Sequence, residues 1–560
     1  MLQRLCGVGL ILGTLFFAAS LTPSLVPRTV QIQGLLAGLC MALGYGIGVL
    51  LRRLWNYLEL PQAPASLRAR TNAVLLVLCA AVVIVFLWLA APWQNAVRAG
   101  MDLPPLPRSY PFKLFVLALV TFVVLLFLGR LIGYAMRRTA ALLRRFIPRR
   151  VANVLGVTVA AVLLWMLARD LLFSRVMQGL DASYRELDEL IEPERPQPDD
   201  PGRTGSAASL VEWEELGRAG REFVASGPSV ANITALTGRD ARQPLRVYVG
   251  LRSGEDATGR AELALAELKR QGGFDRKVLV IITPTGTGWV DPSAMDALEY
   301  MHDGDVASVA MQYSYLSSPL SLLVHPEVGA TSARALFDAV YGYWTSLPRD
   351  QRPRLYLHGL SLGAMNSERS TQVFQMFEDP ISGALWSGPP FQSTLWRSLT
   401  ESRNPGSPKW LPQVGDGRLV RFMNQQGTTL PADAPWGVMR LMYLQYADDA
   451  IVFFDVRDAW RRPEWLDPPR GPGVSPTLRW YPVVTMMQVA LDMMLAMDTP
   501  PGHGHVYAPE HYAQAWAEVT GITHWSAEDL EKLKRHLAEV ARKNMESEGG
   551  KEDAYDNRGG

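Results

Sequence analysis

The chain has 560 residues and a formal net charge of +1, from 55 Lys and Arg against 54 Asp and Glu. This length predicts more than one domain, since a typical domain has about 150 residues. The balanced charge argues against the strongly basic surface of a nucleic-acid-binding protein, so we expect no nucleic acid partner.

The cysteines and histidines divide the chain into two chemically different parts. All three cysteines, Cys6, Cys40 and Cys79, lie in apolar stretches, which predicts small apolar side chains and no disulfide framework. The eight histidines all lie between His302 and His536. Acid and base chemistry is therefore expected in the later part of the chain.

Five apolar stretches in the N-terminal third predict five membrane spans. A helix needs about 20 apolar residues to cross a hydrocarbon core of about 30 Å, and a stretch such as 73–91 has no polar face. The first stretch is also compatible with a cleaved signal peptide, but the second follows so closely that we favour its retention. The stretches are 5–21, 32–51, 71–93, 112–136 and 151–167.

The basic residues between these stretches predict how the chain is oriented. The second-to-third and fourth-to-fifth connections carry ten arginines, whereas the two other connections carry four basic residues. Because basic loops stay in the cytoplasm, the chain after the fifth span is expected outside it. No Asp or Glu lies in the middle of a span, which favours a role as an anchor over an ion pathway.

The chain after the spans predicts a linker and one large domain. Residues 192–205 are rich in Pro, Asp and Glu, a composition that cannot form a core. From residue 209, predicted strands alternate with predicted helices, which is typical of a mostly parallel, doubly wound α/β sheet. The expected strands are 245–251, 277–282, 306–315, 354–357, 383–387 and 439–446, and the expected helices are 291–302, 331–347, 362–377 and 526–544.

These patterns predict four regions along the chain. They are a transmembrane helical domain over 1–175, a linker over 176–208, an α/β domain over 209–545 and a disordered tail over 546–560.

The segment Gly359-Leu-Ser361-Leu-Gly363 has the pattern G-x-S-x-G between a predicted strand and a predicted helix. In that context the pattern indicates a strained turn that lifts the serine hydroxyl above the sheet, with glycines where side chains would collide. The alternative is a tight turn with a structural serine. We predict Ser361 as a nucleophile, with Gly359 and Gly363 forming the nucleophile elbow.

Together with this elbow, four further segments resemble a family of bacterial multi-pass membrane α/β-hydrolases. They are SLTPSL at 20–25, TPTGTGW at 283–289, AMQYSY at 310–315 and GHGHVY at 502–507. The resemblance covers nearly the whole chain and implies a membrane-embedded N-terminal region followed by an α/β-hydrolase domain of serine-hydrolase type. It implies no particular substrate. One departure is Leu360, where an acidic residue is expected, and this affects pocket polarity more than mechanism.

In the α/β-hydrolase fold the partners of the serine follow in the order acid, then histidine. Asp449 matches the Asp-x-Ile-Val pattern of this fold and is preferred to Asp448 as the acid. The base is His503 or His505, in a glycine-rich loop near the domain's end; His503 fits the pattern slightly better, and both remain candidates.

A His-x-His pair can also bind zinc, but no cysteine and no evident third ligand accompanies this one. We therefore predict no metal and no cofactor.

Attack on a carbonyl group creates an oxyanion that needs hydrogen-bond donors fixed in advance. One predicted donor is the backbone N–H of Leu362, directly after the nucleophile. The other is expected from the loop 283–289, at Thr285 or Gly286, whose surroundings allow close backbone approach. This loop lacks the Gly-Lys-Ser/Thr ending of a P-loop, so nucleotide binding is not expected.

The sequence as a whole predicts a membrane-anchored serine hydrolase that cleaves an ester or thioester through an acyl-enzyme. The lipid bilayer is the expected partner. Aromatic residues near predicted strand ends, including Tyr315, Trp386 and Trp396, are compatible with an acyl or lipid-like substrate. The alternatives are an envelope acyltransferase that uses the same triad and a non-catalytic, membrane-anchored binding protein.

Overall fold

The computed structural model forms two compact units, and both are discontinuous in sequence. The first contains residues 1–178 and 454–499, and the second contains 179–453 and 500–560. This division differs from the predicted one because the segment 454–499 packs with the N-terminal helices. The structure describes residues 6–61, 64–143, 158, 162, 166, 183–192, 195–318, 320–321, 327–371, 378–431 and 433–556.

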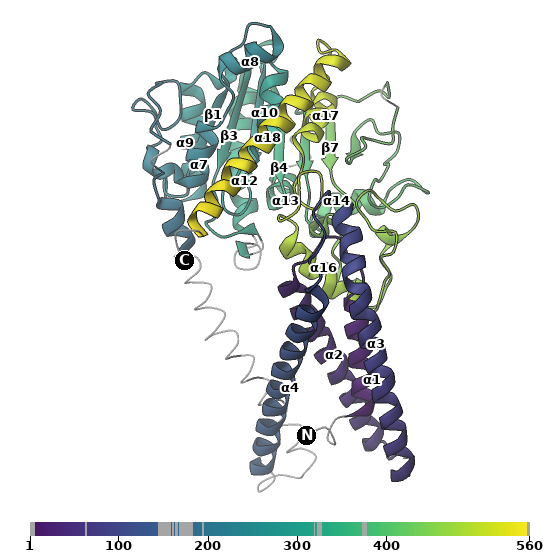
Figure 1. The fold of residues 1–560 in the computed structure, drawn as a ribbon. Coiled ribbons are helices and arrows are strands. Elements are labelled where there is room, and N and C mark those ends of the chain that lie inside the picture. Colours follow the sequence, from purple (N-terminus) through teal and green to yellow (C-terminus); the bar gives the residue numbers. More distant parts are fainter. Residues whose placement is uncertain are drawn as a thin grey trace. The chain divides into compact units, whose positions relative to one another are not determined.

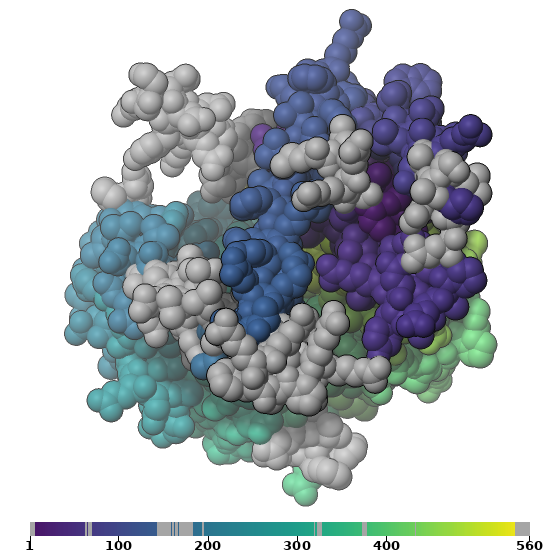
Figure 2. Space-filling model, turned by 90° about the horizontal axis from the view of Figure 1, so that it is seen from below, coloured from purple at the N-terminus to yellow at the C-terminus, as the bar shows by residue number. Residues whose placement is uncertain are grey.

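The first unit is built around apolar helices (Figure 1). Three stretches are long and apolar enough to cross a membrane, namely Val30–Tyr57, Arg70–Ala99 and Tyr110–Thr139. In the space-filling view of Figure 2 they appear among the purple and blue residues. The N-terminal helices are α1 (Gly7–Ser20), α2 (Val30–Tyr57), α3 (Ala65–Ala99) and α4 (Tyr110–Leu143).

Large apolar side chains are exposed along α3 and α4. Val77 is 68% exposed, Trp88 75% and Phe127 68%. Exposed apolar surface on this scale marks an interaction surface on a protein, and on long apolar helices it fits contact with lipid. Membrane association of this unit follows from the length and the exposed composition of these helices.

Three of the five predicted spans correspond to these long helices. The first predicted span forms α1, whose 14 residues rise about 21 Å at 1.5 Å per residue, less than the hydrocarbon core. The helix ends at Ser20, two residues before Thr22, and the side chains of both residues donate hydrogen bonds to backbone carbonyls of its last turn. The fifth predicted span, 151–167, lies outside the described residues except at 158, 162 and 166.

Small residues let α1 and α2 approach closely. A Cβ added at Gly44 would lie 2.5 Å from the carbonyl oxygen of Leu12, and one added at Gly48 would lie 2.5 Å from Cα of Gly9. The two backbones are therefore in direct contact, which is the helix packing expected from this glycine-rich stretch.

The segment 454–499 contributes a further apolar helix to the first unit, α16 (Val484–Leu495). Val484 packs in one buried cluster with Ala19 of α1 and with Leu36 and Cys40 of α2. In Figure 1 this helix, drawn in yellow-green, lies beside the purple helices. Two 3-10 turns precede it, η7 (Val456–Ala459) and η8 (Glu464–Leu466).

The second unit contains a sheet of seven strands in the order β1-β3-β2-β4-β5-β7-β6, and every pairing is parallel. Most strand residues are buried, as in a sheet covered by helices on both faces. The strands are β1 (Leu245–Val249), β2 (Val278–Thr283), β3 (Val306–Met311), β4 (Arg354–Leu360), β5 (Gly383–Ser387), β6 (Val420–Met423) and β7 (Arg440–Leu444).

The helices of this unit form two groups: α12 contacts both α9 and α13, and α10, α17 and α18 contact one another. The predicted α/β class is therefore confirmed. In chain order the helices are η3 (Trp213–Leu216), α7 (Gly217–Ala225), α8 (Val230–Thr237), α9 (Ala257–Arg270), η4 (Gly273–Asp275), α10 (Pro292–Met301), α12 (Val328–Ser346), η5 (Arg349–Gln351), α13 (Leu362–Ser370), α14 (Thr394–Glu401), α15 (Ala450–Phe453), α17 (Pro509–Thr520) and α18 (Ala527–Asp556).

One predicted boundary differs from this structure. Thr204, in the predicted linker, is fully buried and donates a hydrogen bond to the carbonyl of Arg246 in β1. Helix α18 is assigned as far as Asp556, and the disordered tail expected over 546–560 stays a prediction.

Glu368 is a buried carboxyl group on α13, the helix that follows the elbow. It lies beside the Tyr443 hydroxyl and the first backbone N–H groups of α14, at Leu395 and Trp396. Among the described residues, neither carboxyl oxygen meets hydrogen-bond geometry. Burial therefore raises the pKa of Glu368 from 4.5 to about 8.

This pKa shift predicts how stability depends on pH. Between 4.5 and about 8 the unfolded chain releases the Glu368 proton and the folded chain keeps it, so the free energy of unfolding falls as pH rises. Thermal unfolding in detergent is expected to show that Glu368→Gln gains stability relative to wild type from pH 5 to 8, by at most about 1.4 kcal/mol per pH unit. The exposed control Glu401→Gln should track wild type; a pH-independent difference for Glu368→Gln would contradict the assignment.

Candidate active site

The serine of the G-x-S-x-G pattern lies in a strained turn between β4 and α13. Ser361 has φ 56° and ψ −125°, a region that residues with a side chain rarely adopt. Its N–H donates to the carbonyl of Ser387 at the end of β5 over 2.9 Å. The residue is 7% exposed, so the turn keeps Ser361 buried.

The two glycines of the pattern are required by close backbone contacts. A Cβ at Gly359 would lie 2.5 Å from the carbonyl carbon of Gly363, and one at Gly363 would lie 2.2 Å from the carbonyl oxygen of Thr283. The elbow thus lies in direct contact with the end of β2. This is the local structure that the pattern predicted.

Asp449 and His505 form a buried pair. His505 Nδ1 lies 2.6 Å from Asp449 Oδ2, and the two side chains are 2% and 0% exposed. Asp449 also accepts hydrogen bonds from the Tyr507 hydroxyl, at 2.8 Å, and from the Ile451 N–H, at 2.9 Å. An ionised carboxylate only accepts hydrogen bonds, so Nδ1 is the protonated nitrogen and Nε2 of a neutral His505 carries the lone pair. Among the described residues, Nε2 has no hydrogen-bond partner.

The neighbouring Asp448 and His503 form a second pair. His503 Nδ1 lies 3.1 Å from Asp448 Oδ2; the aspartate is fully buried and the histidine side chain is 24% exposed. Burial raises the pKa of Asp448, and the nearby His503 opposes this. Of the two histidines that the sequence left open, His505 is therefore the one paired with the predicted acid, Asp449.

The loop that carries both histidines is fixed by its own hydrogen bonds. Gly502 and Val506 are joined by a backbone hydrogen bond of 2.8 Å, and Gln425 donates to the Gly502 carbonyl over 3.0 Å. The Tyr507 ring stacks on Tyr446, with 4.4 Å between the ring centroids. The loop is thus held by contacts on both sides of His505 in the chain.

Gly388 connects the elbow to the histidine. It follows Ser387, the acceptor of the Ser361 N–H, and a Cβ added to it would lie 2.5 Å from His505 Cε1. The Cε1 atom of the imidazole, between Nδ1 and Nε2, therefore lies against Gly388 at the end of β5. The preceding residue, Ser387, accepts the hydrogen bond from the Ser361 N–H.

The predicted oxyanion-hole donors differ in whether they already donate to a group within the described residues. Leu362 is the first residue of α13, and the first N–H groups of a helix have no partner within it. In contrast, the Thr285 N–H donates to the Trp289 carbonyl at 3.0 Å, and the Gly286 N–H to Ser318 Oγ at 3.1 Å. These two donors would have to share or release their partners to bind an oxyanion.

Sequence reasoning missed Asp291, which follows the loop 283–289. Asp291 is buried, caps α10 through the Ser293 N–H at 2.9 Å, and lies close enough to His505 and Tyr512 for electrostatic interaction. Burial raises the pKa of Asp291 to about 6. The available signal was an Asp-Pro pair at the start of a helix, which indicates a cap but not a neighbour of the histidine.

The aromatic residues expected near a pocket mouth are core residues. Trp386 is 2% exposed and donates to Ser367 Oγ over 3.0 Å, and Trp396 is 3% exposed and donates to Gln445 Oε1 over 2.7 Å. Both indoles are thus held by buried hydrogen bonds within the sheet and helix layers. They therefore give no support to the expected acyl or lipid-like substrate.

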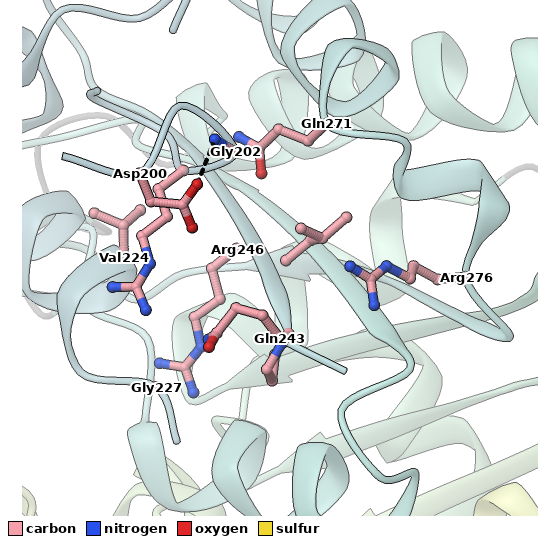
Figure 3. A pocket seen from close by; sticks show the side chains of 11 residues that line it. Asp200, Gly202, Val224, Gly227, Gln243, Arg246, Gln271 and Arg276 are labelled. Atoms are coloured by element: carbon pink, nitrogen blue, oxygen red, sulfur yellow. Dashed lines mark hydrogen bonds between the residues drawn. The ribbon is translucent and has the colours of Figure 1, made fainter. Parts of the chain in front are cut away.

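A cavity of about 280 Å³ lies elsewhere in this unit, at the amino end of β1 (Figure 3). Its lining includes Arg203, Arg246 and Arg276 and none of the candidate catalytic residues. In a parallel sheet the amino ends of the strands lie at the opposite edge from the carboxyl ends, which carry Ser361 and Asp449. This cavity is therefore separate from the candidate active site.

The comparisons with known proteins agree with the fold. Residues 245–533 match the model of an Alpha/beta-hydrolase family, and residues 21–228 match the model of the N-terminus of the same family. The chain belongs to this family. The searches of curated proteins and of solved structures gave no match.

The close contact at Gly388 predicts that Gly388→Ala disturbs the His505 ring. The new methyl group would overlap Cε1 at 2.5 Å, and overpacking of this kind costs about 1–3 kcal/mol of stability. Gly415→Ala is the matched control, because Gly415 also has a positive φ, of 56°, but no atom lies within 4 Å of an added Cβ. Thermal unfolding is expected to show a larger loss for Gly388→Ala; equal losses would contradict the contact.

Proposed function

We propose that the protein is a membrane-anchored serine hydrolase that cleaves a carboxylic ester or thioester. The observation that carries this proposal is the buried Asp449–His505 pair, whose Nε2 has no partner among the described residues, beside the backbone that holds Ser361 in a strained turn. Membership of an Alpha/beta-hydrolase family supports the reaction class. In this proposal Ser361 is the nucleophile, His505 the base and Asp449 the acid.

The first half of the reaction forms an acyl-enzyme. His505 Nε2 accepts the proton of the Ser361 hydroxyl while Oγ attacks the substrate carbonyl carbon. The resulting oxyanion accepts a hydrogen bond from the Leu362 N–H, at the positive end of the α13 dipole. Asp449 keeps the imidazole in the productive tautomer and stabilises its positive charge. The intermediate collapses, and the leaving alcohol or thiol takes the proton from Nε2.

The second half releases the acid. A water molecule attacks the acyl carbonyl as Nε2 takes its proton, and the proton then returns to Ser361 Oγ as the ester bond breaks. The half-buried His503 is not required for either step in this scheme. Its pair with Asp448 holds the loop that presents His505.

The membrane anchor supports an acyl or lipid-like substrate. Three helices are long and apolar enough to cross a bilayer, and a bilayer concentrates molecules with acyl chains next to an anchored enzyme. The excess of arginine in alternate loops supports a multi-pass membrane protein with the catalytic domain outside the cytoplasm. The proposed location in a bacterial cell membrane comes from the resemblance of the sequence segments to a bacterial family.

Labelling with a fluorophosphonate tests the proposal, since this probe reacts with an activated serine. Wild type is expected to label and Ser361→Ala to remain unlabelled. His505→Ala should lower the labelling rate by at least about 100-fold, in line with the loss of a general base, whereas His503→Ala should lower it far less. Absence of labelling in wild type, or equal labelling of Ser361→Ala, would contradict the proposed activity; equal effects of the two histidine variants would contradict the assignment of the base.

A further inference from the structure

A second cavity, open to solvent and about 370 Å³ in volume, lies in the first unit, in the segment that precedes α16. Three arginines, two leucines and a tryptophan line it, and no carboxyl group of the described chain does. The lining residues are Arg462, Leu466, Arg470, Leu478, Arg479 and Trp480. This arginine cavity thus combines a cluster of positive charge with an apolar wall.

The charge of the three arginines is only partly balanced. Arg462 lies 3.4 Å from Asp467, but both side chains are more than half exposed, so solvent weakens this pair. Arg470 and Arg479 donate to backbone carbonyls of residues 475–478 over 2.8 to 3.3 Å. Neither of them forms an ion pair within the described part of the chain, so two guanidinium groups lack a carboxylate partner there.

The guanidinium groups are close enough to repel one another. Burial lowers the pKa of Arg470, and the positive charges of Arg479 and Arg462 lower it further. Arginine stays protonated in proteins, so the repulsion persists until an anion binds among the three groups. Arginine binds phosphate through paired hydrogen bonds, and a phosphate group has more oxygens to share among three arginines than a carboxylate has. The arginine cavity therefore fits a phosphate group.

This cavity lies beside the N-terminal apolar helices. Tyr481, the residue after Trp480, packs against the buried cluster that contains Ala19 of α1 and Leu36 of α2. Figure 1 shows α16, which follows directly, next to these helices. One side of the cavity is therefore a single residue away from the surface of α1 and α2.

A buried ion pair holds the segment on these helices. Arg28, between α1 and α2, places Nη2 2.6 Å and Nε 2.9 Å from Asp492 Oδ1 on α16, and both side chains are 0% exposed. Gln488 donates to the carbonyls of Thr22 and Ser20, at 3.0 and 3.3 Å. All of these residues belong to the first unit, so the segment that carries the cavity is fixed beside α1 and α2.

The length of α2 places this contact near the membrane surface. Its 28 residues extend about 42 Å at 1.5 Å per residue, more than the hydrocarbon core of about 30 Å. Leu36 lies six residues after the start of α2, which corresponds to about 9 Å. Gln31, in the first turn, is polar and exposed. This end of α2 thus extends into the layer where lipid phosphates lie.

Exposed apolar side chains of the same segment support contact with lipid. Trp460, Met494 and Met497 are each more than half exposed. Tryptophan is enriched at the interface between membrane and water, and arginines next to exposed apolar side chains are typical of elements that lie on a membrane surface. These side chains favour a lipid over a soluble ion as the source of the phosphate.

We propose that the cavity lined by Arg462, Arg470 and Arg479 binds the phosphate of an anionic lipid headgroup and thereby holds the segment 454–499 at the membrane surface. Inorganic phosphate offers the same anionic oxygens but has no acyl chains. The inference does not depend on the proposed hydrolase activity.

Native mass spectrometry of the full chain in detergent tests this site, with dioleoylphosphatidylglycerol as the probe. Wild type is expected to bind this lipid more tightly than dioleoylphosphatidylcholine, whose choline group cancels the phosphate charge. Arg470→Gln and Arg479→Gln should each raise the apparent Kd for the anionic lipid by about 10-fold or more, in line with the loss of a hydrogen bond between charged groups. Arg479→Lys keeps the charge but not the paired contact and should give an intermediate value.

The matched control is Arg461→Gln, the same loss of charge at an exposed arginine that pairs with Glu464 and does not line the cavity. It should bind as wild type does. If Arg470→Gln does not fold, Arg479→Gln decides, because that side chain is exposed.

Three outcomes would overturn the inference. The first is equal affinity of wild type for the two lipids, and the second is equal binding by the Arg479 and Arg461 variants. The third is displacement of the anionic lipid by an equimolar amount of inorganic phosphate, which would identify a soluble phosphate as the ligand instead.

Discussion

The strained turn at Ser361 is the constraint on which the candidate site depends. A residue with a side chain at a φ of 56° costs about 1–3 kcal/mol and persists only where the surrounding structure leaves no alternative. Here the neighbours on three strands supply that restraint: β2 through Thr283, β4 through Gly359 and β5 through Ser387. The parallel sheet therefore fixes the conformation that the hydroxyl group needs, and the other candidate groups follow at the same edge.

Buried carboxyl groups have different surroundings in this protein. Asp449 accepts hydrogen bonds from an imidazole, a phenol and a backbone N–H, and Asp492 is paired with a guanidinium and accepts from a hydroxyl and a backbone N–H. Donors of this kind compensate for lost hydration and allow a carboxylate to remain charged in the interior. Glu368 has no bond of this quality among the described residues, and burial raises its pKa to about 8.

The sequence predicted those features that depend on local pattern. The elbow could be predicted because G-x-S-x-G between a strand and a helix has one common geometry. The long apolar helices could be predicted because the length of a membrane span follows from the thickness of the bilayer. Strand β6 was missed, since its four residues include Arg421. The sequence could not predict that His505 pairs with Asp449 and His503 with Asp448. The two histidines, like the two aspartates, are the same residue type in nearly the same place in the chain, and only the direction of each side chain in the fold distinguishes them.

The sequence pattern could also not predict that residues 454–499 belong to the first unit, because contacts such as that between Arg28 and Asp492 join residues 464 positions apart. Its consequence concerns how the protein can be divided. The chain passes between the units again after Phe453 and after Thr499, so no single cut yields a complete hydrolase unit. A soluble version would need a short designed bridge in place of the intervening residues. Evolutionary separation of the enzyme from its membrane helices would face the same topological obstacle.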